Sequence, residues 1–107
     1  MATKQEMAVA KYATQLKKMK VPVDMKKLEK VTKELGSANY RLDAMFVAAS
    51  DKKELMTVYK NFVVKKLGVK NEPKGMKVVM DVAKKMKKIR KKYRGVFYYM
   101  VSKNLGK

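Results

Sequence analysis

The apolar side chains at the start of the chain recur at the spacing of one face of a helix. Thr3 and Glu6 stand three residues apart, as in a capping box that satisfies backbone N–H groups at a helix start. The stripe that follows consists of Val9, Tyr12, Ala13, Leu16 and Met19. We therefore expect a first helix over residues 4–19.

A proline and a glycine delimit the second predicted element. Pro22 disfavours a helical conformation in the residue before it, and Asp24 is a suitable N-cap for a new helix. Gly36 stands where a helix commonly ends in a left-handed residue. The apolar stripe between them consists of Leu28, Val31, Thr32 and Leu35. These features predict a short second helix.

The middle of the chain predicts one short and one longer helix. Residues 37–47 are too densely apolar to define a single face, and we expect a short, mostly buried helix capped by Ser37. Ser50 and Asp51 then offer a new helix start. A wide apolar face follows and ends at Gly68; it consists of Leu55, Val58, Tyr59, Phe62, Val63 and Leu67.

Two further stripes fill the last third of the chain. After the break at residues 71–73, one stripe consists of Met76, Val79, Met80, Ala83 and Met86. The same face would continue to Lys87 and Arg90, which cannot be buried unpaired, so this helix should end near Met86. The last stripe, which Gly106 stops, consists of Tyr93, Val96, Phe97, Met100 and Val101. The whole pattern predicts an all-α fold, a compact single-domain bundle of five to six helices over residues 1–107, two of them short.

Charge is the abnormal property of this sequence. The chain has 28 Lys and Arg against 9 Asp and Glu, which gives a net charge of +19. Residues 1–53 contribute 12 basic and 6 acidic side chains (+6), and residues 54–107 contribute 16 and 3 (+13). A domain with this charge repels itself unless a polyanion neutralises it.

The densest cationic segment lies between the last two predicted helices. It holds eight cations in eleven residues: Lys84, Lys85, Lys87, Lys88, Arg90, Lys91, Lys92 and Arg94. Phosphates are the natural partners of such a segment, because each neutralised phosphate releases counter-ions without any contact to a base. The alternative interpretation is a solvated helix junction with no ligand. We weigh the polyanion interpretation above it and nominate these eight residues as nucleic-acid-binding.

Tyrosines and methionines have two interpretations each. Tyr98 and Tyr99 lie beside the basic segment and could stack on the bases of a single strand, but we favour a packing role for both. Six of the ten methionines occupy apolar helical positions: Met19, Met45, Met76, Met80, Met86 and Met100. We expect these six to pack in the core and not to form a partner-binding groove.

Several function classes find little support in the composition. The chain has no His and no Cys, so we expect no catalytic activity, no metal site, no cofactor and no disulfide. No stretch approaches the roughly 20 apolar residues of a membrane span, and the first residues lack the apolar run of a signal peptide. We expect an intracellular location, in the cytoplasm or nucleoid, or a place inside a virus particle.

Three segments resemble those of an uncharacterised family of small bacterial all-helical domains. They read ANYRLDA, then SDKKEL with TVYKNFVVKKLG, then KYRGVFYYMVSKNLG, and the similarity extends from about Lys11 to Gly106. The resemblance implies an all-helical fold and no catalytic or binding residues. Members of that family have a small polar break before the KYR segment, where this chain has KKMKKIRKK over residues 84–92. The basic segment is therefore not explained by the resemblance.

Two main functional hypotheses follow. The first is a non-enzymatic protein that binds nucleic acid through phosphate contacts without sequence specificity, such as a nucleoid or virion component, with DNA preferred over RNA as the partner. The second is a structural or protein-interaction module that binds an acidic protein partner or self-associates. Attachment to anionic lipid is a third, weaker alternative.

Overall fold

Helices account for most of the chain in the computed structural model, which describes residues 3–41, 45–48 and 50–106, with the backbone alone at 37 and 38. The α-helices are α1 (Lys4–Lys18), α2 (Met25–Leu35), α3 (Lys52–Val58), α4 (Glu72–Lys85) and α5 (Arg94–Leu105). A 3₁₀ turn, η1 (Gly36–Asn39), follows α2, and a π-helical segment, η2 (Tyr59–Val64), continues α3. The described ranges contain no strand beyond one isolated bridge between Phe46 and Tyr93, so the all-α prediction is confirmed.

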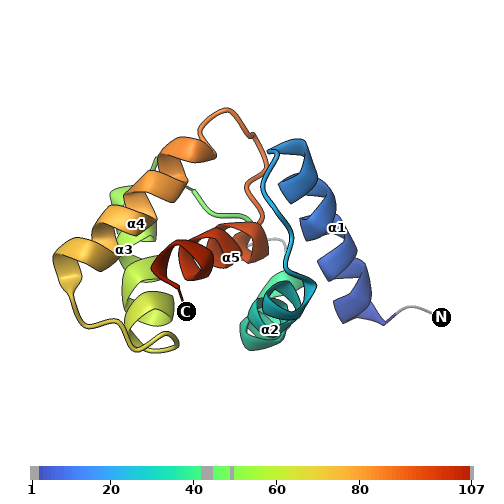
Figure 1. Cartoon of the computed structure of the whole chain (residues 1–107), viewed down its shortest axis with the longest axis horizontal. Coiled ribbons are helices and arrows are strands. Elements are labelled where there is room, and N and C mark those ends of the chain that lie inside the picture. Colours follow the sequence, from blue (N-terminus) through green and yellow to red (C-terminus); the bar gives the residue numbers. More distant parts are fainter. Residues whose placement is uncertain (1–2, 42–44, 49, 107) are drawn as a thin grey trace.

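The last helix lies at the centre of the molecule. Figure 1 shows α5 between the pair α1 and α2 on one side and the pair α3 and α4 on the other. Every residue of α5 from Gly95 to Ser102 is buried. A helix that is buried all round in this way is the core of a bundle rather than a surface element. The Cα radius of gyration is 12.7 Å, close to the ~13 Å expected of a compact chain of this length.

Local capping fixes most helix boundaries. The side chains of Thr3, Asp24 and Asn71 accept hydrogen bonds from backbone N–H groups three residues later, at 3.1, 3.3 and 3.2 Å. Gly36 and Gly106, at the C-termini of α2 and α5, have positive φ angles of 56° and 70°. These caps satisfy backbone groups that a helix end would otherwise leave unpaired.

The short helix predicted over residues 37–47 is wrong in its described part. The 3₁₀ turn gives way to an irregular chain in which the Val47 N–H donates to the Lys92 carbonyl at 2.8 Å. The Met45 carbonyl accepts from the Arg94 N–H at 2.7 Å. Residues 42–44 lie outside the described residues. The backbone here bonds to a segment almost fifty residues away, so tertiary pairing overrides the local apolar pattern.

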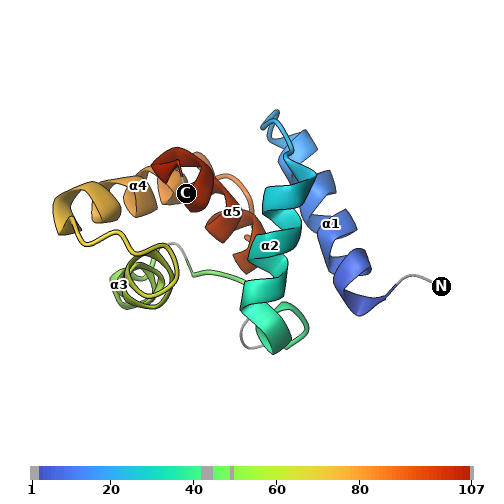
Figure 2. The ribbon, with the colours of Figure 1, turned by 60° about the horizontal axis from the view of Figure 1, so that its bottom comes forward.

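The helix predicted to end at Gly68 is also different from a regular α-helix. It starts at Asp51 as expected, but after Val58 it widens into the π-helical η2. Figure 2 views this helix nearly along its axis. The Leu67 N–H accordingly bonds to the Phe62 carbonyl five residues earlier, at 2.9 Å. The predicted apolar face is nevertheless buried, because Phe62 and Val63 are at most 1% exposed.

The two tyrosines of α5 pack in the core, as favoured from the sequence. The Tyr98 ring stacks on Phe62 with centroids 4.3 Å apart, so the KYRGVFYYMV segment packs against the KNFVVKKLG segment. The Tyr99 hydroxyl donates to the Pro22 carbonyl at 2.8 Å and accepts from the Asp24 N–H at 2.9 Å. Tyr99 therefore ties the α1–α2 connection to α5.

Core packing holds for some of the methionines only. Met86 is fully buried and Met100 is 2% exposed. Met80, in contrast, is 50% exposed on α4, so the core position predicted for it is wrong. Helical spacing placed Met80 on the same stripe as Val79, but only one edge of that stripe faces α5.

Candidate nucleic-acid interface

The predicted basic segment covers the end of α4 and the connection to α5. Figure 1 shows this connection at the top of the molecule, away from α2. Met86 and Ile89 point toward the core, fully buried and half-buried, and the Ile89 N–H donates to the Met86 carbonyl at 2.9 Å. Six cations between and beyond these two anchors are exposed: Lys84, Lys85, Lys87, Lys88, Arg90 and Lys91. We call these six residues the basic run.

The basic run has no internal charge compensation in the described part of the chain. None of its six side chains forms an ion pair with a carboxylate that the structure describes. Six like charges within eight residues repel one another, and each is accessible to an anion in solution. The run thus has the electrostatic requirement of a surface that contacts successive phosphates.

Lys92 is partly committed to the protein itself. Its ammonium group donates to the Ile89 carbonyl at 2.5 Å, and its own carbonyl accepts from the Val47 N–H. The side chain is half-buried. Lys92 therefore fixes the shape of the connection, and fewer of its donors are available to a ligand.

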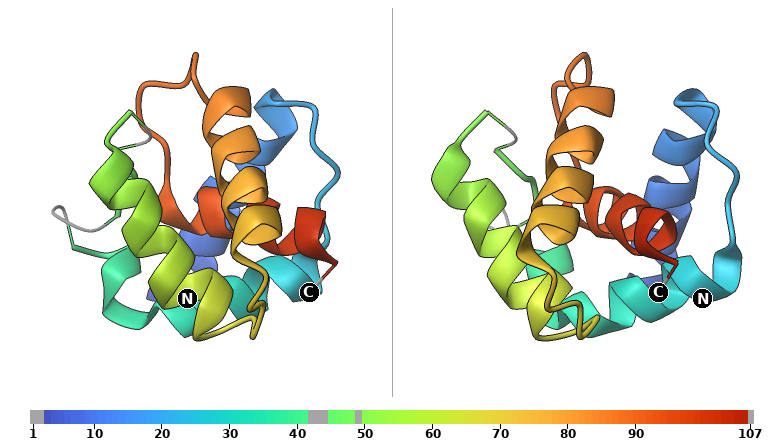
Figure 3. Two further views of the ribbon diagram at one scale, coloured as in Figure 1. Left: turned by 90° about the vertical axis from the view of Figure 1, so that its left-hand side faces the viewer. Right: turned by 60° about the vertical axis from the view of Figure 1, so that its left-hand side comes forward.

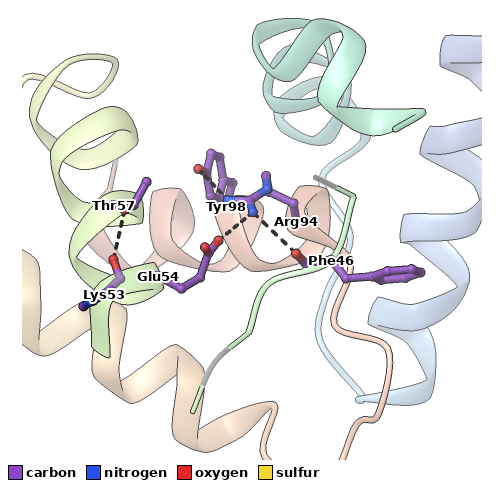
Figure 4. A network of polar contacts seen from close by, with 6 residues as sticks. All are labelled: Phe46, Lys53, Glu54, Thr57, Arg94 and Tyr98. Carbon is purple, nitrogen blue, oxygen red and sulfur yellow. Dashed lines mark hydrogen bonds and ion pairs between the residues drawn. The ribbon is translucent and has the colours of Figure 1, made fainter. Parts of the chain in front are cut away.

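Arg94 lies apart from the run, although its sequence position groups it there. Figure 4 shows its guanidinium between α3 and the segment around Phe46. Nη2 lies 2.5 Å from Glu54 Oε1, and Nη1 donates to the Tyr98 hydroxyl at 3.2 Å. The side chain is 12% exposed. Arg94 joins α5 to α3, so its assignment to a phosphate-binding surface is not supported by its position.

The electrostatics of Arg94 follow from this setting. Burial alone would lower the pKa of its guanidinium, but the hydrogen bond and attraction from Tyr98, followed by those from Glu54, outweigh burial and raise it. Burial likewise raises the pKa of Tyr98, against the opposing effect of Arg94. The guanidinium of Arg94 is therefore a permanent positive charge that the fold holds in place.

A hollow of about 460 Å³ opens beside the basic run. Its apolar lining consists of Leu55, Met80 and Ala83, and its polar lining consists of Ser50, Lys84, Lys87 and Lys92. The hollow belongs to the same surface as the run because Lys84 and Lys87 are shared. Periodicity predicted none of it, since its walls come from α3, α4 and the connection.

Within the described ranges, no three His, Cys, Asp or Glu side chains gather in a group that could hold a metal ion. None of the helices in those ranges is long and apolar enough to cross a membrane.

Comparisons with known proteins identify the family but no activity. No curated protein matches the chain. A family model described as a protein of unknown function (DUF2853) matches residues 11–107, which include α2 to α5 and most of α1. The match covers nearly the whole chain and the segments on which the resemblance rests. The chain therefore belongs to the DUF2853 family of proteins of unknown function.

Proposed function

We propose that this chain is a non-enzymatic protein that binds nucleic acid through its phosphates, without sequence specificity. The observation that carries the proposal is the basic run, whose six exposed cations have no ion-pair partner among the described residues. Duplex DNA is the favoured partner, in a nucleoid or a virus particle, where a polyanion must be neutralised.

The composition of the run favours backbone contacts over base contacts. Five of its six cations are lysine and only Arg90 is arginine. Lysine is a mobile point charge, whereas bidentate recognition of a base edge is typical of arginine. Contacts of this kind position a protein on the backbone and carry no sequence information.

Salt dependence tests the proposal quantitatively. If about five cations of the run contact phosphates, the log of the affinity for duplex DNA should fall against log salt with a slope near −5. A variant with Lys85, Lys87, Lys88 and Lys91 changed to Gln should have a slope shallower than about −3. The matched control, called the distal control, changes the exposed residues Lys4, Lys11, Lys60 and Lys74 to Gln. It leaves out Lys17 and Lys18, because the last turn of α1 borders the run through the hydrogen bond from the Gln15 amide to the Lys91 carbonyl. Its slope should stay within about one of the parent's.

Each outcome of this experiment bears on the proposal. A folded four-lysine variant with the parent's slope would move the binding surface away from the run. An equally shallow slope in the distal control would mean that total charge, and not the run, determines the salt dependence. No retention of the parent on duplex DNA, single-stranded DNA or RNA at low salt would refute nucleic-acid binding.

The second candidate is a protein-interaction module, which the hollow beside the run favours. Met80 contributes a half-exposed apolar side chain to a lining that also holds three lysines. This combination suits an acidic protein segment with an apolar anchor. Assembly with a protein partner, or with itself, that resists salt would support this candidate, because burial of apolar surface is not screened by ions.

A further inference from the structure

A second hollow with lysine walls lies between α2 and the end of the α3–η2 helix. Its volume is about 440 Å³, and four lysines line it: Lys26, Lys27, Lys30 and Lys66. The other lining residues are Val31, Leu67, Ser102 and a single carboxylate, Glu34. We call the four lysines the α2 surface. Four cations against one anion leave this hollow strongly positive.

The lysines of the α2 surface are available to a ligand. Lys26, Lys30 and Lys66 are exposed, and Lys27 is half-buried. None of the four forms an ion pair with a carboxylate in the part of the chain that the structure describes, Glu34 included. Lys66 approaches the three α2 lysines only through folding, because 36 positions separate it from Lys30. This surface therefore shares the properties that distinguish the basic run.

The two cationic surfaces lie on opposite sides of the molecule. In Figure 1 and in both views of Figure 3, α2 lies at the bottom and the connection between α4 and α5 at the top. The molecule measures 43 × 28 × 27 Å. Duplex DNA is straight on this scale, since its persistence length is about 500 Å. Wrapping one duplex around a body of this size to contact both surfaces would require a sharp and energetically costly bend.

From this arrangement we infer that one copy of the protein bridges two nucleic-acid duplexes, one on the basic run and one on the α2 surface. The inference rests on the proposed phosphate binding and adds a second site to it. Each surface neutralises a different duplex, and the folded body sets the distance between them. A nucleic acid bound in this way is condensed as well as neutralised.

Energy transfer between duplexes measures bridging directly. Two populations of a short duplex, one with a donor dye and one with an acceptor, are mixed with limiting parent protein, and transfer should rise well above the protein-free level. The α2-surface variant, with Lys26, Lys27, Lys30 and Lys66 changed to Gln, should lose most of that rise while its salt slope on one duplex stays near −5. The basic-run variant should lose bridging too, and its slope on one duplex should be shallower than about −3. The distal control should bridge like the parent.

The outcomes separate this inference from the function on which it rests. A parent that binds single duplexes without energy transfer, or an α2-surface variant that still bridges, overturns bridging and leaves phosphate binding intact. A parent that binds no duplex overturns both. An equimolar mixture of the two four-lysine variants should not restore transfer; restoration would mean that contacts between copies hold the duplexes together. Circular dichroism of each variant excludes unfolding as the cause of a loss.

Discussion

Replacing Gly95 by alanine should disturb the contact between α1 and α5 more than any comparable change. Gly95 is buried in the first turn of α5, directly against the Tyr12 ring of α1. A Cβ atom at this position would lie 2.2 Å from Tyr12 Cε2 and 2.6 Å from Cδ2. Carbon atoms pack at about 3.5 to 4.0 Å, so the ring would have to move by more than ~1 Å.

The surroundings of Tyr12 resist that movement. The side chain is 1% exposed, and its hydroxyl donates to Asn39 Oδ1 at 2.7 Å. Asn39 is itself fixed, because its amide donates to the carbonyls of Thr32 and Gly36 at 2.7 and 2.8 Å. Overpacking costs about 1 to 3 kcal/mol, and a strained or lost buried hydrogen bond costs about 1 to 3 more. The better helix propensity of alanine offsets up to about 1 kcal/mol.

We therefore expect Gly95→Ala to lower the free energy of unfolding by roughly 2 to 4 kcal/mol, measured by urea denaturation. Gly75→Ala is the matched control, since a Cβ there would lie 2.8 Å from Tyr59 Cε2 and 3.1 Å from Val63 Cγ1, and should cost less. Adding Tyr12→Leu to Gly95→Ala should cost less than the sum of the two single changes, because the smaller side chain removes the clash. A loss below about 1 kcal/mol for Gly95→Ala, or strict additivity, would refute the proposed contact.

Three further predictions concern the core and the buried cation. Phe62→Ala and Phe97→Ala should each lower the free energy of unfolding by about 3 to 5 kcal/mol, and losses below about 1 kcal/mol in urea denaturation would place these rings outside the core. Burial raises the pKa of Tyr12 from 10.0 to about 12, with smaller effects in the same direction from the charges of Tyr40 and Tyr93. The contribution of Tyr12 to the free energy of unfolding is therefore complete below pH 10 and is lost as the pH rises to 12. Urea denaturation at pH 9 and at pH 12 gives the decrease in the free energy of unfolding between these two pH values. That decrease should be smaller by about 2 to 3 kcal/mol in Tyr12→Phe than in the parent, and equal decreases would contradict the prediction. Arg94→Gln should cost about 1.5 to 3 kcal/mol by leaving Glu54 without its cation; its salt slope on DNA should stay within about one of the parent's, and a larger change would return Arg94 to the binding surface.

The sequence predicted those features of the fold that depend on near neighbours. The starts of α1, α2 and α4 depend on a side chain and a backbone N–H three residues apart, and such pairs are visible in one dimension. The segment around Phe46 was misjudged because its backbone partners lie at residues 92–94. Tyr98 fell outside the predicted stripe for a related reason, since a helix buried all round has no single apolar face to detect.

The candidate site shows the same division. Exposure of the basic run follows from its density of charge, which no core of this size can bury. Arg94 was grouped with the run because its partner Glu54 precedes it by 40 positions, a separation that no local spacing indicates. The α2 surface was missed because Lys66 joins the α2 lysines only in the folded chain. Charge counts predict that cations are accessible, while the surfaces they form depend on tertiary structure.

The residues of the core are separate from those of the cationic surfaces, so surface charge can be neutralised without loss of core contacts. Met86 is fully buried between the exposed Lys85 and Lys87, so neighbouring residues serve the core and the surface independently. Neutralising the run leaves the core contacts in place and relieves repulsion between like charges, which favours the folded state. If the chain binds nucleic acid as proposed, the polyanion should act in the same direction, since it would engage cations that only the folded chain holds in two arrays. On the proposed function, the large positive charge costs stability in the free protein, and bound nucleic acid would restore that stability.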